Sequence, residues 1–158
     1  IAPVHIENSE VAESTKIFTE ELLTAFESES GVESKLSDIK KAEKSNPLTY
    51  IGTDKADGVL LTTIHKYEER QGSAAGSENP AKLDFTMRLL NGKDGKEVWN
   101  AIFHFKDQTL LENLFEADAR FVGGTLGFKK AREVLQVGFR DAARKFAEER
   151  TSQFTRIR

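Results

Sequence analysis

The 158-residue sequence contains no cysteine, only three prolines and a single tryptophan. Without cysteine, the chain has no disulfide framework, no thiol chemistry and no thiolate metal site. It also lacks any uncharged run that approaches the ~20 residues of a membrane-spanning helix. With 38% hydrophobic and 31% charged residues, its composition excludes both a disordered and a membrane-embedded chain. The length predicts one domain over residues 1–158 with a single core.

Charge is unevenly distributed along the chain. Residues 1–79 hold 8 basic and 15 acidic residues, whereas residues 80–158 hold 15 basic and 11 acidic residues. Acidic residues interrupt the basic excess near the C-terminus, and such mixed patterns are typical of a solvated helix face. A nucleic-acid-binding stripe would be more purely basic, so no nucleic-acid partner is expected.

Two segments carry apolar residues at helical spacing. Asn8 is a favourable N-cap for the first helix, which continues for about five turns to Gly31. The second helix begins near Thr125 and extends to about Arg150. Its apolar stripe follows the 3.6-residue period and consists of Phe128, Ala131, Val134, Leu135, Phe139, Ala142 and Phe146. Weaker patterns predict strands at residues 2–6 and 32–36, and helices at residues 37–44 and 109–121.

Three strands are predicted in the middle of the chain, at residues 57–69, 81–90 and 97–107. Apolar and polar residues alternate in them, which is the two-residue period of a strand with one buried face. By this alternation, Ile64 faces one way, whereas His65 and Tyr67 face the other. The Asn-Gly and Asp-Gly pairs of residues 91–96 favour a tight hairpin turn. The Gly- and Ser-rich segment 70–80 is expected to be a mobile loop between antiparallel strands.

The order of these elements predicts an α/β (α+β) fold. Its single mixed sheet is mainly antiparallel and contains a three-stranded meander, and the N-terminal helix and the long C-terminal helix cover it. Because a helix follows the first strand, one outer strand is expected to be parallel to its neighbour.

Glu68, Glu69 and Arg70 form the densest charged cluster in the predicted meander. Adjacent strand residues point to opposite faces, so Glu68 and Glu69 do not converge as paired catalytic carboxylates would. The cluster is therefore interpreted as a charged bend at a strand end. Together with Tyr67, the residues Glu69 and Arg70 are predicted to contact a partner protein, with Arg70 able to bind a carboxylate.

The other candidate sites are weak. His5, His65 and His104 lie on three predicted strands without the short spacings of zinc ligands, so no metal site is predicted. Trp99, Phe103 and Phe105 share one strand face, and they would form an RNA-stacking platform only if that face were exposed. The stretch Gly123–Gly127 precedes a helix, where free amides can bind an anion. Gly123, Gly124, Lys129 and Lys130 are therefore an alternative anion-binding or small-ligand site, although no nucleotide motif or cofactor site is present.

Several stretches together resemble a group of Gram-negative envelope lipoproteins. The matching residues lie in the opening strand, in a strand that runs into Tyr-x-Glu-Arg-x-Gly, and in a Pro-Ala strand followed by a strand whose usual pattern is Val-Leu-Trp and which here contains Val98-Trp99. They include Ala56, Asp57, Val59, Leu60, Tyr67, Glu69, Arg70, Gly72, Pro80, Ala81, Val98, Trp99, Gln108, Asn113 and Leu114. This resemblance implies a fold like those of the TolB amino-terminal domain and of the periplasmic domains of the lipoproteins CsgG and LpoB.

The resemblance also implies a function without chemistry. It predicts a non-enzymatic periplasmic domain that binds other cell-envelope proteins, or further copies of itself, as an accessory or adaptor subunit. The resemblance further implies a signal peptide and a lipid-modified cysteine upstream of Ile1, and a sequence that starts at Ile1 rather than Met is compatible with such processing. Such an anchor would be the only contact with the outer membrane.

Overall fold

The computed structural model describes residues 1–7, 14–36, 56–69, 71–73, 76–79, 81–106 and 130–155. The elements follow in the order β1 (His5–Ile6), α1 (Ser14–Ser30), β2 (Gly58–Glu68), β3 (Gln71–Ser73), β4 (Gly76–Asn79), β5 (Lys82–Asn91), β6 (Glu97–Lys106) and α3 (Ala131–Thr155). The helices predicted at residues 37–44 and 109–121 lie outside the described residues. Among the described helices, neither is long and apolar enough to cross a membrane.

The main sheet has four strands in the order β1-β2-β5-β6. The three longer strands pair antiparallel and form the predicted meander, whereas β1 pairs parallel to β2, with His5 opposite Thr63. Beyond the two residues of β1, the Ala2 amide donates to the Leu60 carbonyl and the Glu7 amide to the Ile64 carbonyl. The mixed, mainly antiparallel sheet and its two covering helices confirm the predicted α+β fold.

A β-bulge in β2 overturns one detail of the predicted alternation. The register between β2 and β5 shifts between Ile64 and Lys66, so that Ile64 lies opposite Phe85 and Tyr67 lies opposite Leu83. Tyr67 therefore faces the same way as Ile64, and its ring lies 5.1 Å from that of Phe18 on α1. The expectation that Tyr67 faces away from Ile64 is wrong because a bulge inserts one extra residue into the two-residue period.

The turn between β5 and β6 is the tight one that its sequence predicts. The Asn91 amide donates to the Lys96 carbonyl, and Gly95 adopts a positive φ of 68°. Asn91 and Asp94 each accept a backbone N–H two residues later, which is the local bonding that favours these residues in turns. The segment predicted to be only a loop instead contains the small antiparallel pair of β3 and β4.

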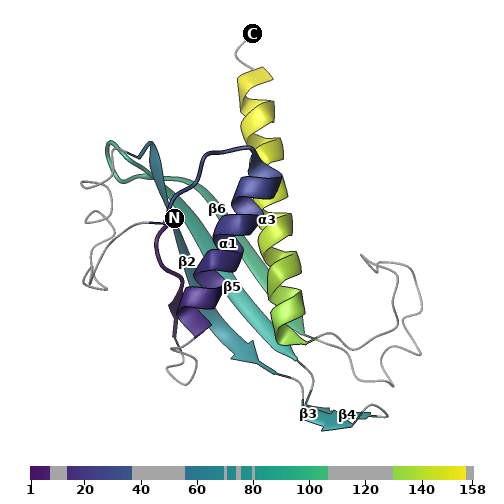
Figure 1. Ribbon diagram of the computed structural model, residues 1–158. Helices are drawn as coiled ribbons and strands as arrows, with labels where there is room; N and C mark the ends of the chain where they lie inside the picture. The colour runs from purple at the N-terminus through teal and green to yellow at the C-terminus, as the bar shows by residue number, and fades with distance from the viewer. Residues whose placement is uncertain are drawn as a thin grey trace.

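Both helices lie side by side on one face of the sheet (Figure 1). α1 ends at Ser30, and Gly31 follows with a φ of 63°, as expected of a glycine at a helix C-terminus. α3 continues to Thr155, one turn beyond the predicted end near Arg150, and the predicted start at Thr125 lies outside the described residues. Residues 31–36 form no strand, so the predicted edge strand at 32–36 is wrong.

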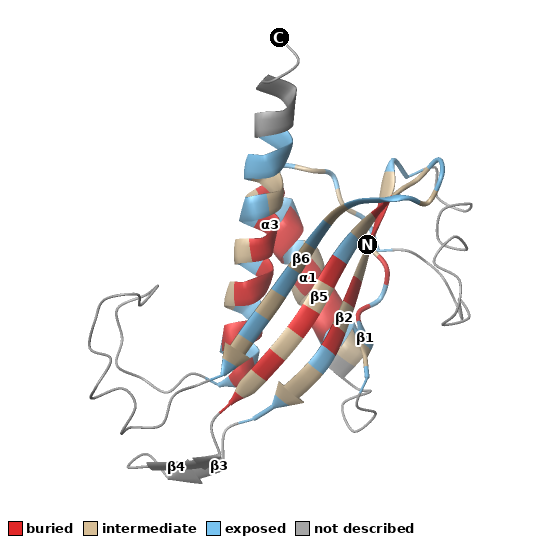
Figure 2. Ribbon diagram, turned by 180° about the vertical axis from the view of Figure 1, so that it is seen from behind, coloured by how far each residue is buried: buried red, intermediate tan, exposed pale blue. Residues whose placement is uncertain are grey.

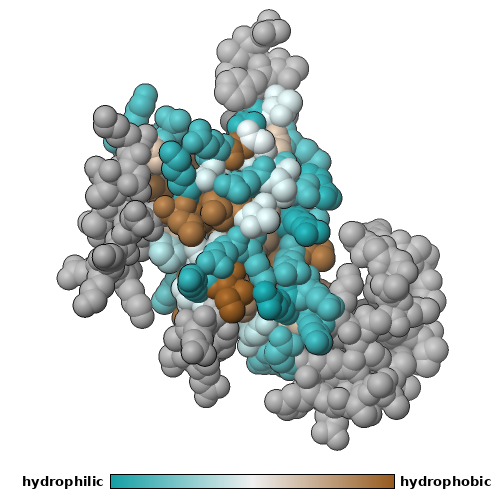
Figure 3. Space-filling view, viewed as in Figure 1, coloured by the Kyte–Doolittle hydropathy of each residue, from teal (hydrophilic) through white to brown (hydrophobic). Residues whose placement is uncertain are grey.

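The core lies between the sheet and the helices. Leu83, Phe85 and Met87 on β5 are fully buried against Leu135 and Phe139 of α3 and against apolar residues of α1. Gly138 brings α3 close to the sheet, because a Cβ at this position would lie 2.9 Å from a carbon of the Phe85 ring. Seen from the helix side, the surface is mostly hydrophilic with small hydrophobic patches (Figure 3).

The opposite face of the sheet is covered by no described helix (Figure 2). We call it the open face and define it by the following outward-facing residues of the four strands: His5, Leu61, Thr63, His65, Lys66, Asp84, Thr86, Arg88, Val98, Asn100, Ile102, His104 and Lys106. None of these residues is buried. Val59 and Leu90 pair with each other on this side near the Asn91 end, but both are buried. Away from them, the same three long strands have one apolar, sealed face and one exposed, mainly polar face.

Candidate functional site

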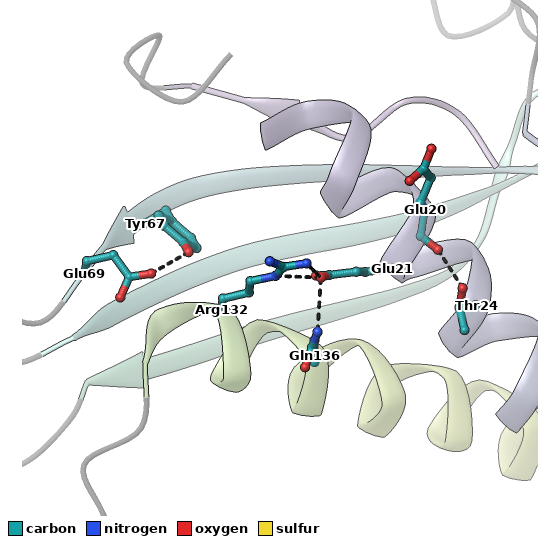
Figure 4. A network of polar contacts seen from close by, with 7 residues as sticks. All are labelled: Glu20, Glu21, Thr24, Tyr67, Glu69, Arg132 and Gln136. Atoms are coloured by element: carbon teal, nitrogen blue, oxygen red, sulfur yellow. Dashed lines mark hydrogen bonds and ion pairs between the residues drawn. The ribbon is translucent and has the colours of Figure 1, made fainter. Parts of the chain in front are cut away.

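The two helices meet through side chains of opposite charge. Glu21 of α1 accepts hydrogen bonds from Arg132 and Gln136 of α3, at 2.8 Å from Arg132 Nε and 3.0 Å from Gln136 Nε2 (Figure 4). Two turns further along α1, Glu29 lies 3.4 Å from Arg144 of α3. Acidic side chains from the first half of the sequence thus pair with basic side chains from the second half. These basic residues of α3 were predicted to be only a solvated face.

Tyr67 and Glu69 connect the end of β2 to the start of α3. The Tyr67 hydroxyl donates to Glu69 Oε1 over 2.7 Å (Figure 4). Glu69 Oε2 accepts the Ala131 amide over 3.1 Å. A carboxylate at a helix N-terminus satisfies a free amide and interacts favourably with the helix dipole. The predicted partner-binding residues Tyr67 and Glu69 thus have a place in the fold itself, whereas Arg70 lies outside the described residues.

The surroundings of Tyr67 raise the pKa of its hydroxyl. Partial burial raises the pKa of the Tyr67 hydroxyl well above its usual value, and the hydrogen bond to the negative Glu69 raises it further. Neighbouring Glu68 points elsewhere and lies 2.9 Å from Lys82 and 3.3 Å from Lys66, and the hydrogen bond from Lys82 lowers the pKa of Glu68. Glu68 and Glu69 therefore diverge as predicted, and they do not form a catalytic pair.

An open hollow of about 240 Å³ lies along the groove between α1 and α3. Glu20, Glu21, Arg132 and Arg140 line it, together with smaller residues of both helices. Two of these charges, Glu21 and Arg132, already pair with each other at 2.6 Å. The hollow therefore resembles a solvent-filled groove between two helices more than a binding site whose polar groups are free to contact a ligand.

Only one residue of the predicted anion site lies in the described part of the chain. Gly123, Gly124 and Lys129 lie outside it, and Lys130 is exposed just before α3. The amides at this helix start are already bonded, since Lys130 donates to Glu133 Oε2 over 3.3 Å and Ala131 donates to Glu69. An anion that used these amides would have to displace two carboxylates.

The three histidines all belong to the open face but do not converge. His65 lies 3.0 Å from Glu7 and 2.9 Å from the Thr86 hydroxyl, whereas His104 pairs with Asp84 and His5 lies opposite Thr63. Within the described ranges, no group of three or more potential ligands could hold a metal ion.

The aromatic residues of β6 face the helices. The Phe103 ring stacks on that of Phe85 at 4.8 Å, and Trp99 meets Phe146 of α3 edge to face at 5.3 Å. Together with Phe105, these rings are partly buried against the core. They are therefore not arranged as an exposed base-stacking platform.

The most unusual exposed feature is one that the sequence patterns did not single out. Ile102 and Val98 of β6 belong to the few large hydrophobic residues with exposed side chains, at 80% and 53% relative exposure. Both follow from the strand alternation, which places Ile102 on the face opposite Phe103. The signal was present in the pattern, but the sequence does not show that β6 is the last strand of the sheet.

The comparisons with known proteins bear on the fold alone. No protein-family model and no curated protein matches the chain. In fold, the chain is similar to PelC. A PelC dodecamer from Paraburkholderia phytofirmans superposes with a TM-score of 0.55 at 10% identity, covering 92% of this chain and 82% of that one. A second crystal form of the PelC dodecamer gives a TM-score of 0.54.

Two further solved structures are less similar. XCC0632 from Xanthomonas campestris, a DUF330 protein, has a TM-score of 0.48 at 14% identity over 89% of this chain and 66% of its own. The lipoprotein GNA1162 from Neisseria meningitidis has a TM-score of 0.36 at 16% identity over 67% and 78%. The specific likeness to TolB, CsgG and LpoB that the sequence pattern implies stays a prediction.

Proposed function

We propose that this chain is a non-enzymatic, protein-binding domain of a Gram-negative envelope lipoprotein. It would lie in the periplasm, be anchored to the outer membrane through a lipid on a cysteine upstream of Ile1, and act as an accessory or adaptor subunit of an envelope assembly. The residue pattern around Tyr67 and Trp99, which resembles that of envelope lipoproteins, carries the proposal. The similarity in fold to the PelC dodecamer, over 92% of the chain, supports its protein-binding part.

The arrangement of polar groups also favours binding over chemistry. Glu21, Glu69 and Arg132 hold the helices to each other and to the sheet. The open face, by contrast, exposes polar and apolar side chains across four strands, and exposed sheet faces and edges are common protein-binding surfaces. PelC is a dodecamer in its crystals, and assembly from several copies is compatible with this domain as well.

Localisation is tested with the full-length gene product in its native cell. Metabolic labelling with palmitate should mark the protein, and fractionation should find it with the outer membrane. Replacing the upstream cysteine with serine should abolish both results. An unlabelled protein in the cytoplasmic fraction would contradict the proposal.

Protein binding is tested by placing a photo-crosslinking amino acid at Asn100 on the open face and, as a control, at Lys16 on the exposed side of α1. Crosslinks to defined envelope proteins from position 100, absent from position 16, are the expected result. Enzyme-like turnover by the purified domain on ester, phosphate or glycosidic substrates would contradict the non-enzymatic part.

Anion or small-ligand binding at residues 123–130 is the second candidate function. Exposed Lys130 at the start of α3 favours it, whereas the bonded amides of Lys130 and Ala131 oppose it. A ligand that binds only the folded state raises the melting temperature. No shift with phosphate, nucleotides or peptidoglycan fragments at millimolar concentration would exclude this candidate.

A further inference from the structure

β6 is the outermost strand on its side of the sheet. It pairs with β5, and no other described strand lies beside its second edge. This edge is ten residues long and contains Ile102, whose side chain is 80% exposed. Native proteins normally protect such edges with prolines, charges or very short strands, because unpaired backbone groups there pair readily with another chain.

The ladder identifies the free backbone groups of β6. In an antiparallel sheet, the N–H and C=O of a residue point to one neighbouring strand, and those of the next residue point to the other. Gly92 donates to the Asp57 carbonyl over 2.8 Å, so even-numbered residues at this end of β5 bond towards β2. The odd-numbered residues of β5 therefore bond to β6, where they lie opposite odd-numbered residues such as Ala101 and Phe103. It follows that, beyond the bulge at Val98, the even-numbered residues of β6 from Asn100 to Lys106 have their N–H and C=O at the free edge.

We infer that β6 pairs antiparallel with β6 of a second copy of this chain, about a two-fold axis that passes near Ile102. A two-fold axis normal to the sheet is the only one that places two identical strands antiparallel, and it keeps both helix layers on the same side. This symmetry also requires that each residue lies opposite a residue whose side chain is on the same face of the sheet. Pairing centred on Ile102 uses the free backbone groups of Asn100, Ile102 and His104, and it would join two four-stranded sheets into one continuous sheet.

The strand is complementary to itself in this register. On the open face, Ile102 meets Ile102 of the second copy, so the most exposed hydrophobic side chain is covered on both chains. Asn100 meets His104, and Val98 meets Lys106. On the helix side, the small Ala101 meets the large Phe103, and Trp99 meets Phe105. These aromatic rings are only partly buried in the single chain.

The charges at the strand ends favour a second copy as the partner. Glu97 at the start of β6 turns to the open face at the bulge opposite Leu89 and Leu90, where it accepts hydrogen bonds from Arg88 and Asn100. Lys106 lies at the other end of the strand and on the same face. Antiparallel pairing places the acidic start of each strand near the basic end of the other, and among residues 98–106 no like charges directly oppose each other, which would be unfavourable.

This inference deepens the proposed function and rests on its statement that the domain works by binding protein, but its test is separate. Because the chain has no cysteine, one substitution introduces a unique thiol. In the pairing centred on Ile102, the two Cα atoms of residue 102 lie about 5.5 Å apart. That distance lies within the roughly 4.4–6.8 Å that a disulfide spans.

Ile102→Cys should therefore form a disulfide-linked dimer under mild oxidation of the 158-residue chain. Val98→Cys is the matched control, because it is also an exposed apolar residue on β6 but lies about 27 Å from its counterpart in this register. Equal dimer yields for the two variants would overturn the inference. So would the absence of a dimer from Ile102→Cys.

A charge test gives a second readout without cross-linking. Sedimentation velocity should find the parent chain in a concentration-dependent monomer–dimer equilibrium. Ile102→Lys and Ile102→Glu should each weaken self-association by about a hundredfold or more, because each places two like charges together at the axis. Mixing the two variants should restore a dimer that contains one of each, which only an interface passing through residue 102 predicts.

Two results would overturn the inference here. One is a parent chain that stays monomeric over the accessible concentration range, and the other is an oligomer that Ile102→Lys leaves intact. Either could occur while the photo-crosslinks to envelope proteins remain, so a failure of the inference is distinguishable from a failure of the proposed function.

Discussion

The two faces of the sheet are made by alternate residues of the same strands, and they differ in almost every property. On the helix-covered face, Leu83, Phe85 and Met87 are completely buried. On the open face, alternate residues of the same strand, such as Thr86 and Arg88, are in contact with water and with polar side chains of the adjacent strands. The covered face therefore determines whether the chain folds, whereas the open face can change with little effect on folding. Four predictions test this division.

The largest effect is expected at the centre of the covered face. Phe139→Ala removes a ring that is completely buried and packs edge to face on Phe85 at 5.2 Å. The free energy of unfolding should fall by about 3–5 kcal/mol, because the change leaves a cavity. Ile102→Ala is the control on the open face and should change it by no more than about 0.5 kcal/mol.

Urea denaturation at concentrations where the chain is monomeric measures both variants. Similar losses from Phe139→Ala and Ile102→Ala would mean that the open face also contributes to stability. The proposed division between the faces would then be wrong.

A smaller effect is expected where the covered face ends. Glu69→Ala removes the carboxylate that accepts the Ala131 amide and the Tyr67 hydroxyl. Loss of this helix-terminal contact should lower the free energy of unfolding by about 1–2 kcal/mol. Glu68→Ala is the matched control, because among the described residues adjacent Glu68 forms ion pairs with Lys66 and Lys82 near the surface. It should cost no more than about 0.5 kcal/mol, and equal losses would argue against the role of Glu69.

The third prediction concerns alkaline pH. Burial and the hydrogen bond to Glu69 raise the pKa of Tyr67, so folding favours its neutral form. The corresponding stability is fully present below the ordinary tyrosine pKa of about 10 and is lost progressively as the pH rises above it.

Tyr50→Phe leaves Tyr67 as the one tyrosine of the chain, so ultraviolet absorbance can follow its ionisation. Its midpoint should lie well above 10 in the folded state and return to about 10 in denaturant. Adding Glu69→Gln should lower the folded midpoint, because it removes the negative charge beside the hydroxyl. A folded midpoint near 10 would contradict the environment described for Tyr67.

The smallest effect is expected on the open face, at Glu97. The hydrogen bond from Arg88, and then that from Asn100, lowers the pKa of this exposed carboxylate. The stabilisation is present above the ordinary glutamate pKa of about 4.3 and is lost as the pH falls through the folded value. Arg88→Met should raise the Glu97 pKa towards the ordinary value in a carboxyl NMR titration. An unchanged pKa would mean that Arg88 and Glu97 do not pair in solution.

The features that the sequence predicted correctly depend on local chemistry. The Asn91–Lys96 turn rests on residues that tolerate positive φ or bond their own backbone, and these preferences act without the rest of the fold. The apolar stripe of α3 and the alternation of β5 were predictable because a buried face requires apolar residues at a regular spacing over many residues. Fold class follows once these elements are placed.

The features that it missed depend on partners far along the chain. The bulge at Ile64–Lys66 reverses the direction of Tyr67 and is visible only in the register with β5. The weak strand predicted at residues 32–36 finds no neighbouring strand. Glu69 was singled out for its charge, but its contact with the Ala131 amide joins residues 62 positions apart. The pairing of Glu21 with Arg132 likewise required the relative placement of two helices.

The short parallel strand β1 has a consequence for the order in which the chain assembles. β5 and β6 are joined by a tight turn, whereas His5 reaches Thr63 only after the whole segment between them has been brought into a closed loop. Closing a long loop costs more entropy, so contacts between distant residues form later. The N-terminal strand should therefore join last. Until β1 pairs with it, β2 is an edge strand with unpaired backbone groups. A newly synthesised chain therefore passes through an intermediate in which β2, as well as β6, could pair with a strand of another molecule.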